Sequence, residues 1–172
     1  MFQKDDNGNY YSVSDWERFA KNRYGGRTNL AMFVVFGDPS IKLSVPTYMV
    51  VTDSINSHPV GDMSDTVRAL SMVTVTGRVT DGNFQTLSQF NGRLYPSVYD
   101  KKVLTSTLMN DPDPNTEPFE FTVQNSVLFK GNVTVKDGRF RFSFYVPKDI
   151  DYSYGNGRIS YYASTDHVDA VG

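Results

Sequence analysis

The residues best able to do acid–base chemistry in this sequence are its two histidines. Ser57 comes directly before His58, and Asp166 comes directly before His167. A hydrolytic triad needs a nucleophile, a base and an acid that the fold brings together, and adjacency in sequence does not supply that geometry. His58 precedes a proline and His167 lies near the chain terminus, so we expect both in loops. We therefore predict no catalytic residue in this chain.

Metal chemistry has one weak signal in the sequence. The 172 residues contain no cysteine, which excludes disulfides, thiolate metal sites and a cysteine nucleophile within this segment. Asp111, Asp113 and Asn115 have the spacing of a calcium loop, but Thr116 stands where that loop needs glycine and Thr122 where it needs glutamate. We predict no cofactor, with a calcium site of another kind as the alternative to a solvated proline-rich turn.

Tyrosines near the C-terminal end are the best candidates for binding. Tyr152 and Tyr154 lie in a glycine-containing turn, and Tyr161 and Tyr162 follow in an expected strand. Exposed aromatic rings stack on sugars or contact partner proteins, although tyrosines also simply cover strands. Neighbours in a strand point to opposite faces, so we expect either Tyr161 or Tyr162 to be in the core. Tyr152 and Tyr154 are the predicted binding residues.

The N-terminal part of the sequence predicts one helix. Ser14 and Glu17 have the spacing of a capping box, and the helix is expected to run from Ser14 to Tyr24. Trp16 and Phe19 fall on one face of it at helical spacing. Two glycines then follow and should end it.

A buried strand should come next, from Ala31 to Phe36, because that stretch is almost wholly apolar. Gly37, Asp38 and Pro39 follow as a sharp turn, in which Asp38 is expected to bond its own backbone.

Beyond Pro46 the sequence has the character of short antiparallel strands separated by turns. Valine and threonine alternate in several stretches, which is typical of strands with one buried face. We expect an irregularity near Ser71, where the alternation fails, and an edge or bulge at Pro96. The predicted strands cover residues 48–52, 65–80, 90–100, 103–108, 119–123, 127–146 as a hairpin, and 158–164.

The hairpin from Val127 to Val146 carries the most specific prediction. Asp137 and Gly138 form the preferred two-residue turn, since both positions require positive φ. Counting outward from that turn, Val135 should face Phe140, Val133 should face Phe142, and Gly131 should leave room for Phe144. Together these patterns predict a mainly β protein, an immunoglobulin-like antiparallel β-sandwich with a short N-terminal helix–strand extension.

Two stretches resemble a known family. Residues 33–46, FVVFGDPSIKLSVP, resemble the end of the catalytic domain in gingipain-like cysteine peptidases. Residues 127–163, together with Asn91–Leu94 and Val98–Lys101, resemble the region after the peptidase domain in PorU-type sortases of the type IX secretion system. The likeness is weakest over residues 56–65 and 110–116.

The resemblance implies a large parent protein at the bacterial outer-membrane surface. That parent would be a caspase-like cysteine peptidase that removes the targeting domain from secreted cargo and helps link the cargo to lipopolysaccharide. The family's catalytic Cys and His lie before the Gly-Asp-Pro turn, so this chain carries neither. Residues 1–45 would be the tail of the peptidase domain and residues 46–172 the immunoglobulin-like domain behind it. The implied partners are the upstream peptidase domain, secreted cargo and other secretion proteins.

Composition narrows the remaining alternatives. The net charge of −2, without a long basic run, argues against nucleic acid as a partner. No apolar stretch approaches the ~20 residues of a membrane helix, and an export signal would lie upstream. Trp16 and residues 33–36 should pack on the peptidase core and, without it, could drive dimerisation. The alternative function is an independent immunoglobulin-like adhesin or carbohydrate-binding module.

Overall fold

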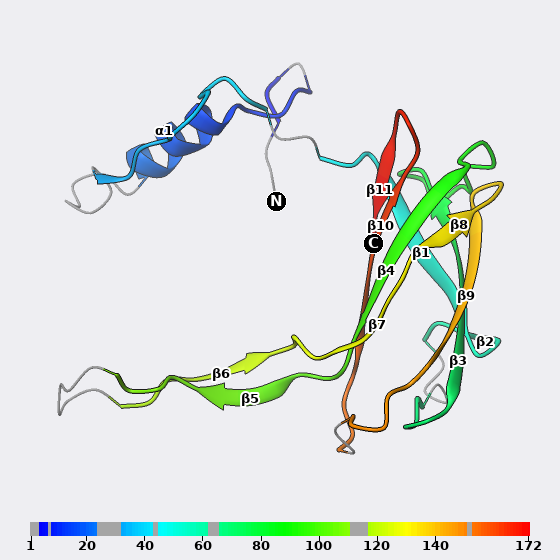
Figure 1. Ribbon diagram of the computed structural model, residues 1–172. Helices are drawn as coiled ribbons and strands as arrows, with labels where there is room; N and C mark the ends of the chain where they lie inside the picture. Colours follow the sequence, from blue (N-terminus) through cyan, green and yellow to red (C-terminus); the bar gives the residue numbers. More distant parts are fainter. Residues whose placement is uncertain are drawn as a thin grey trace. The chain divides into compact units, whose positions relative to one another are not determined.

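The structure is a computed structural model that describes residues 4–6, 8–23, 32–42, 45–61, 66–110, 117–150 and 153–172. The chain divides into two compact units, Met1–Val45 and Pro46–Gly172. It is mainly β, with one short helix among the described elements (Figure 1). Within the described residues, no helix has the length and apolar character needed to cross a membrane.

The first unit contains helix α1 (Val13–Arg23), and its cap differs from the prediction. Ser12, rather than Ser14, caps the helix: its hydroxyl accepts from the Asp15 N–H at 3.3 Å, and its own N–H donates to the Asp15 carboxylate at 3.2 Å. The Ser12 hydroxyl also donates to the Asp15 carboxylate at 2.8 Å, and this bond, followed by the one from the Ser12 N–H, is the main cause that lowers the pKa of Asp15. Ser14 already lies within the first turn, so the capping pair is shifted by two residues.

The predicted buried strand over residues 31–36 is wrong. The described residues 32–36 form no strand, and Phe33, Val34 and Phe36 are 67%, 63% and 94% exposed. Helix α1 buries none of its residues either. A strand needs a neighbour for its backbone groups, and the described part of this unit does not provide one. The apolar side chains of residues 33–36 are thus exposed, although their pattern predicts a buried strand.

The second unit is built on one nine-stranded sheet. Adjacent strands in this sheet run antiparallel, except β1 and β11, which run parallel. The path along the sheet is β7 (Val127–Lys130), β4 (Gly92–Tyr99), β10 (Arg158–Ser164), β11 (Asp169–Val171), β1 (Tyr48–Ile55), β3 (Met72–Thr80) and β9 (Arg139–Tyr145), with β2 (His58–Pro59) beside β1 and β8 (Val133–Val135) beside β4.

The sheet curls so that its two ends share one core. Phe129 of β7 stacks on Phe142 and Phe144 of β9, with ring centroids 5.6 and 4.9 Å apart. Because β7 and β9 are opposite ends of the strand path, these contacts close the sheet around its buried face. A sandwich of two separate sheets is not observed, so the predicted immunoglobulin-like sandwich is not confirmed.

Alternation in β3 is as predicted. Val73, Val75 and Val79 are buried, at 2%, 0% and 0% exposure, and Gly77 lies on the same face, while the residues between them are more exposed. Thr80, at the end of the strand, is buried as well and departs from the alternation. The irregularity expected near Ser71 is also present, because Leu70 has a φ of 61° and β3 begins only at Met72. Period-two burial therefore identified residues 72–80 correctly. The first part of the predicted strand is wrong, because residues 66–71 form no strand and Val67 is 37% exposed.

Pro96 lies in an interior strand rather than at the predicted edge. Tyr161, which faces Pro96 on β10, uses its N–H and carbonyl to bond Gly172 at 2.7 and 3.1 Å. Alternation then turns the backbone nitrogen of Pro96 away from β10, so no ladder bond is lost. On the other side, Pro96 lies between the stretches that pair with β8 and β7, and its carbonyl accepts from Gly131 at 3.2 Å.

The predicted ladder between residues 127–135 and 139–146 is wrong beyond the turn. Lys136 and Arg139 bond reciprocally at 2.9 Å, and Asp137 and Gly138 have φ values of 50° and 72°. After this point the strands separate, because β8 pairs with β4 and β9 pairs with β3. The glycine at 131 accommodates Phe129, not Phe144: a Cβ there would lie 2.5 Å from the Phe129 ring.

Strands β5 (Val103–Ser106) and β6 (Glu120–Val123) form a separate two-stranded sheet. They hydrogen-bond only to each other among the described strands, with Leu104 opposite Thr122 and Thr105 opposite Phe121. Figure 1 shows this pair running away from the nine-stranded sheet within the second unit. We refer to residues 103–109 and 117–123 as the ribbon.

Candidate functional site

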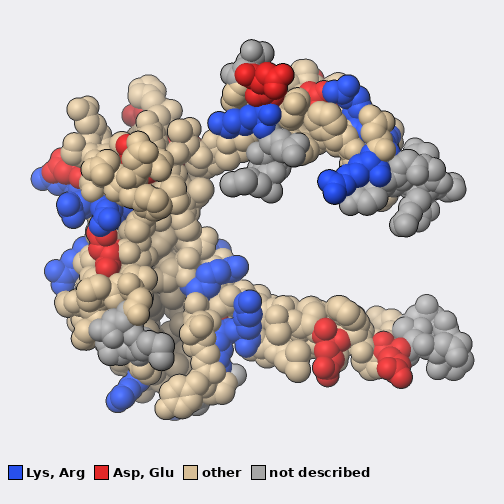
Figure 2. Space-filling view, turned by 180° about the vertical axis from the view of Figure 1, so that it is seen from behind, with Lys and Arg blue, Asp and Glu red and all other residues tan. Residues whose placement is uncertain are grey.

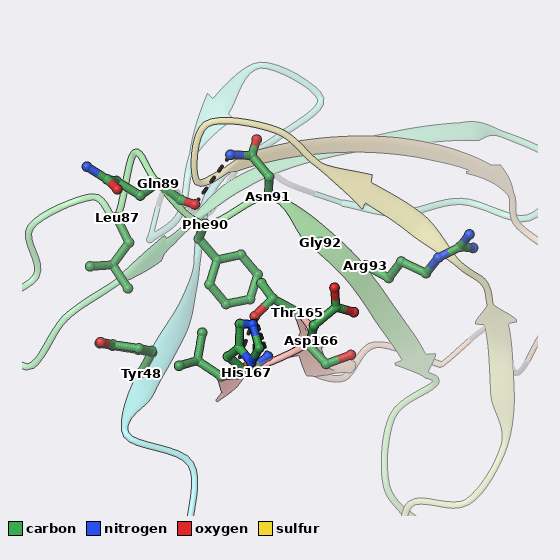
Figure 3. A pocket seen from close by; sticks show the side chains of 12 residues that line it. Tyr48, Leu87, Gln89, Phe90, Asn91, Gly92, Arg93, Thr165, Asp166 and His167 are labelled. Carbon is green, nitrogen blue, oxygen red and sulfur yellow. Dashed lines mark hydrogen bonds between the residues drawn. The ribbon is translucent and has the colours of Figure 1, made fainter.

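A pocket of about 590 Å³ lies beside the loop that joins β10 to β11. Phe90 and Leu87 supply apolar lining, and Arg93, Asp166 and His167 supply charged or polar groups (Figure 3). Phe90 is only 3% exposed, so the floor of the pocket belongs to the core.

The loop beside this pocket is held in a tight turn by Thr165. The Thr165 N–H donates to the Val168 carbonyl at 2.8 Å. The Thr165 hydroxyl accepts from the backbone N–H groups of Val168 and His167 at 3.1 and 3.3 Å. Gly92 lets the loop approach, because a Cβ there would lie 2.2 Å from the Ser164 carbonyl oxygen. The loop is positioned by its backbone, which leaves the side chains of Asp166 and His167 exposed.

The pocket does not assemble catalytic chemistry. Figure 3 shows the Arg93 side chain extending away from His167, so the charged groups do not converge on one point. His58 lies in β2 and is not among the residues that line the pocket. General acid–base catalysis needs a positioned pair of groups around a reacting atom, and this arrangement offers none.

Metal binding finds no support in the part of the chain that the structure describes. No group of three or more His, Cys, Asp or Glu side chains there could hold an ion. Asp111, Asp113 and Asn115, which have the spacing of a calcium loop, lie outside the described residues.

The tyrosines divide between core and surface. Tyr161 is 5% exposed and its hydroxyl shares a 2.8 Å hydrogen bond with Thr52, whereas Tyr162 is 43% exposed. Burial raises the pKa of Tyr161 to about 12, against the opposing effect of the Thr52 hydrogen bond. The prediction that one of this pair would be core is confirmed. Tyr154 is 97% exposed and Tyr152 lies outside the described residues, so the predicted binding role of both stays a prediction.

A row of exposed apolar side chains crosses four neighbouring strands, and the sequence did not indicate it. Tyr95 faces Tyr162, which faces Val171, which in turn faces Met49, so the row spans β4, β10, β11 and β1. Each of the four side chains is 41–43% exposed. The rings of Tyr95 and Tyr162 stack with centroids 6.2 Å apart. Only the strand order brings these residues together, so period-two patterns within one strand could not have found them. We call this set the tyrosine row.

The turn residues singled out from the sequence have local roles. The Asp38 carboxylate accepts from the Ser40 N–H at 2.8 Å and from its hydroxyl at 2.6 Å, and these bonds lower the pKa of Asp38. Gly37, before it, has a φ of 122°, and Pro39 lies in the turn that follows. Gly138 packs so closely that a Cβ would lie 2.3 Å from the Leu87 carbonyl oxygen.

Comparison with known proteins gives an informative likeness. No protein family model matches the chain, and no curated protein matches it. Over its full length the chain is similar to dimeric latent PorU from Porphyromonas gingivalis, with 29% sequence identity and a TM-score of 0.62. This similarity supports a PorU-like relationship. It spans 17% of that PorU chain.

A second solved structure, the sporulation control protein Spo0M from Bacillus subtilis, is 14% identical over 74% of this chain and 47% of its own, with a TM-score of 0.38. That value is too low to establish a shared fold. The PorU likeness therefore supports the relationship inferred from the sequence, while membership of the wider gingipain family is not confirmed.

Proposed function

We propose that this chain is a non-catalytic segment of a larger PorU-like cysteine peptidase at the bacterial cell surface. The observation that carries the proposal is the likeness to PorU over the entire chain, although the chain spans only 17% of that protein. The lack of cysteine fits a segment that leaves the chemistry to another part of the parent. Its work would be to support the peptidase domain.

The exposed apolar residues of the first unit support this role. Met32, Phe33 and Phe36 are 72%, 67% and 94% exposed, and no residue of α1 is buried. Exposed apolar surface on this scale usually marks an interaction site. We propose that the first unit completes the peptidase domain that would precede it, where residues 33–36 could add a strand. The second unit would then be an immunoglobulin-like domain in a curled form.

A binding experiment tests this assignment. The polypeptide encoded upstream in the same gene, expressed separately, should form a complex with the chain. Phe33→Ser combined with Phe36→Ser should weaken that complex at least tenfold, because apolar contacts would be lost. Phe84→Ser is the matched control, since Phe84 is also exposed, at 59%, but lies in the second unit. A gene without a peptidase domain upstream would refute the proposal, as would robust peptide cleavage by the chain alone.

The tyrosine row favours a second candidate function, that of an independent adhesin or carbohydrate-binding module. Neighbouring exposed aromatic rings can stack on sugar rings. Glycan-array binding that is lost in Tyr95→Ala and Tyr162→Ala, but kept in Tyr145→Ala, would support this candidate. Tyr145 is a suitable control because it is 73% exposed on β9 and outside the row. Docking of secreted cargo or other secretion proteins is a further proposed use of the same surface.

A further inference from the structure

Strand β9 is an open edge of the nine-stranded sheet. Among the described strands it pairs along its length with β3 alone, and β8 meets it only at the turn, where Lys136 and Arg139 bond reciprocally. Beyond the turn the two strands separate, because β8 pairs with β4. An unpaired strand edge is a template for another strand, so the chemistry of β9 determines which strand can add there.

The ladder with β3 shows which backbone groups of β9 lie on the open edge. The N–H of Val146, directly after β9, donates to the Ser71 carbonyl, so the even-numbered residues of β9 point their N–H and carbonyl groups toward β3. Alternation then points the backbone groups of Arg141, Ser143 and Tyr145 toward the open edge. These three side chains are exposed, whereas the phenylalanines between them are buried. An added strand would therefore find both backbone groups and side chains accessible.

Arginines crowd the outward face of the sheet at the same place. Arg78 of β3 lies directly opposite Arg139 of β9, and Arg141 is its diagonal neighbour on that face. Because Arg139 is odd-numbered, its pair with Arg78 is of the non-hydrogen-bonded kind, in which opposed side chains lie closest. Like charges in that arrangement are destabilising. The ion pair between Arg78 and Asp53 compensates one of the three charges.

The other two arginines lack such compensation. Among the described residues, neither Arg139 nor Arg141 forms an ion pair. Lys136 adds a further basic group at the turn, beside the acidic Asp137. Figure 2 shows basic side chains gathered, with a few acidic ones, on the side of the second unit where β3 and β9 lie. The chain as a whole has a net charge of −2, so this basic surface is a local property, and it is complementary to acidic groups.

We propose that the β9 edge binds an extended segment of another protein in which every second residue is acidic, and that this segment adds to the sheet as an antiparallel strand. The residues of the segment opposite Arg141, Ser143 and Tyr145 exchange backbone N–H···O=C bonds with them. Directly opposed residues share one face of a sheet, so acidic side chains at these positions meet the arginines. The residues between them point to the other face, toward the phenylalanines of β9.

Two independent features select this occupant. The open backbone groups favour a polypeptide over a polysaccharide or a phosphate group, because a strand offers a matching donor and acceptor at every second residue. The arginines favour an acidic segment over a neutral or basic one. They also disfavour a second copy of β9 at this edge, which would bring two more arginines to a face that already carries three. Strand addition at β9 is independent of any peptidase domain upstream.

A fluorescent peptide in which glutamate alternates with valine is the probe for this edge. Anisotropy with the full chain should show saturable binding, and the matched peptide with lysine in place of glutamate should bind on the order of tenfold more weakly. Arg141→Glu should weaken binding of the glutamate peptide on the order of tenfold and strengthen binding of the lysine peptide. Lys102→Glu is the control, since it makes the same charge change at an exposed residue between β4 and β5. Absence of saturable binding, or equal effects of the two variants, would overturn the proposal.

Methylation of the peptide backbone separates strand pairing from charge. In the antiparallel register each glutamate N–H points toward β9 and each valine N–H points away from it. The peptide N-methylated at its glutamates should therefore lose binding, whereas the peptide N-methylated at its valines should retain it. Both peptides keep the same charges. Equal affinities would mean a purely electrostatic contact and would overturn strand addition.

A variant of the protein tests the same pairing from the other side. Ser143→Pro removes the N–H on the open edge without removing a ladder bond to β3, and it should weaken binding on the order of tenfold. Ser143→Ala is the control, because it loses the same hydroxyl bond to Thr74, 2.7 Å long, but keeps the N–H. Circular dichroism verifies that both variants fold. Heparin that displaces the peptide and binds Ser143→Pro as tightly as the parent chain would identify a general polyanion site and would also overturn the proposal.

Discussion

The nine-stranded sheet and the ribbon are made from similar residues but bury them very differently. Leu94 of β4 is fully buried, and Leu104 of β5 is 62% exposed. Both belong to strands with antiparallel partners. What differs is a second layer: the sheet curls onto itself, while the ribbon has two open faces. Strand formation and core formation are thus separate events in this chain, and only the sheet achieves both.

The largest expected effect sets one leucine against the other. Leu94→Ala should lower the free energy of unfolding by about 2–5 kcal/mol, through lost burial and the cavity left behind. Leu104→Ala should change it by less than about 0.5 kcal/mol, since an exposed surface residue is truncated. Urea unfolding followed by tyrosine fluorescence and far-UV circular dichroism measures both, because the one tryptophan, Trp16, lies in the first unit. Equal losses would show that the ribbon is part of the cooperative core.

Two glycine substitutions test how strictly the backbone of the second unit is constrained. Gly138→Ala should destabilise the sheet by roughly 1–3 kcal/mol, because φ is 72° there and the new Cβ would approach the Leu87 carbonyl. Gly82→Ala is the matched control, as its Cβ would meet nothing within 4 Å. Thermal unfolding distinguishes the two variants. A similar melting temperature for both would mean that the β8–β9 turn can shift without cost.

Alkaline pH should loosen the sheet through Tyr161. Burial raises its pKa to about 12 from the ordinary tyrosine value of 10.0, so the folded state favours the protonated phenol. The stabilisation is complete below pH 10 and is lost as pH rises through the folded pKa. Tyr161→Phe should therefore flatten the alkaline part of the stability curve, at a cost on the order of 1 kcal/mol near neutral pH from the lost hydrogen bond to Thr52.

The smallest effect concerns the ribbon itself. Phe121→Ser should leave the global free energy of unfolding within about 0.5 kcal/mol of the parent chain. Ribbon amides, such as that of Thr105, should exchange hydrogen faster than those of β3, because local opening costs little where few apolar contacts hold the backbone. Hydrogen exchange by mass spectrometry gives both rates. Equal protection of the ribbon and β3 would mean that the ribbon opens no more easily than the nine-stranded sheet.

Local patterns in the sequence predicted the features that depend on neighbours along the chain. Alternation identified Val73, Val75 and Val79 as buried, and parity separated Tyr161 from Tyr162. The parting of β8 and β9 was not predictable in this way, because each strand prefers a partner far away in sequence. Tyr95 and Tyr162 become neighbours only through the strand order, so the tyrosine row was missed. The prediction of a buried strand at residues 33–36 failed for a different reason. Their apolar pattern is typical of a buried strand, but the described part of the first unit contains no element that covers them.

The position of β11 has a consequence for how the chain is made. This strand lies between β10 and β1, and its pairing joins Tyr48 to Ala170 across nearly the whole second unit. During synthesis on the ribosome, β1 emerges early, but it cannot pair with β11 until the unit is almost complete. Such long-range closure slows folding and leaves strand edges open in the meantime. The nascent chain should therefore depend on chaperones until residues 169–171 leave the exit tunnel.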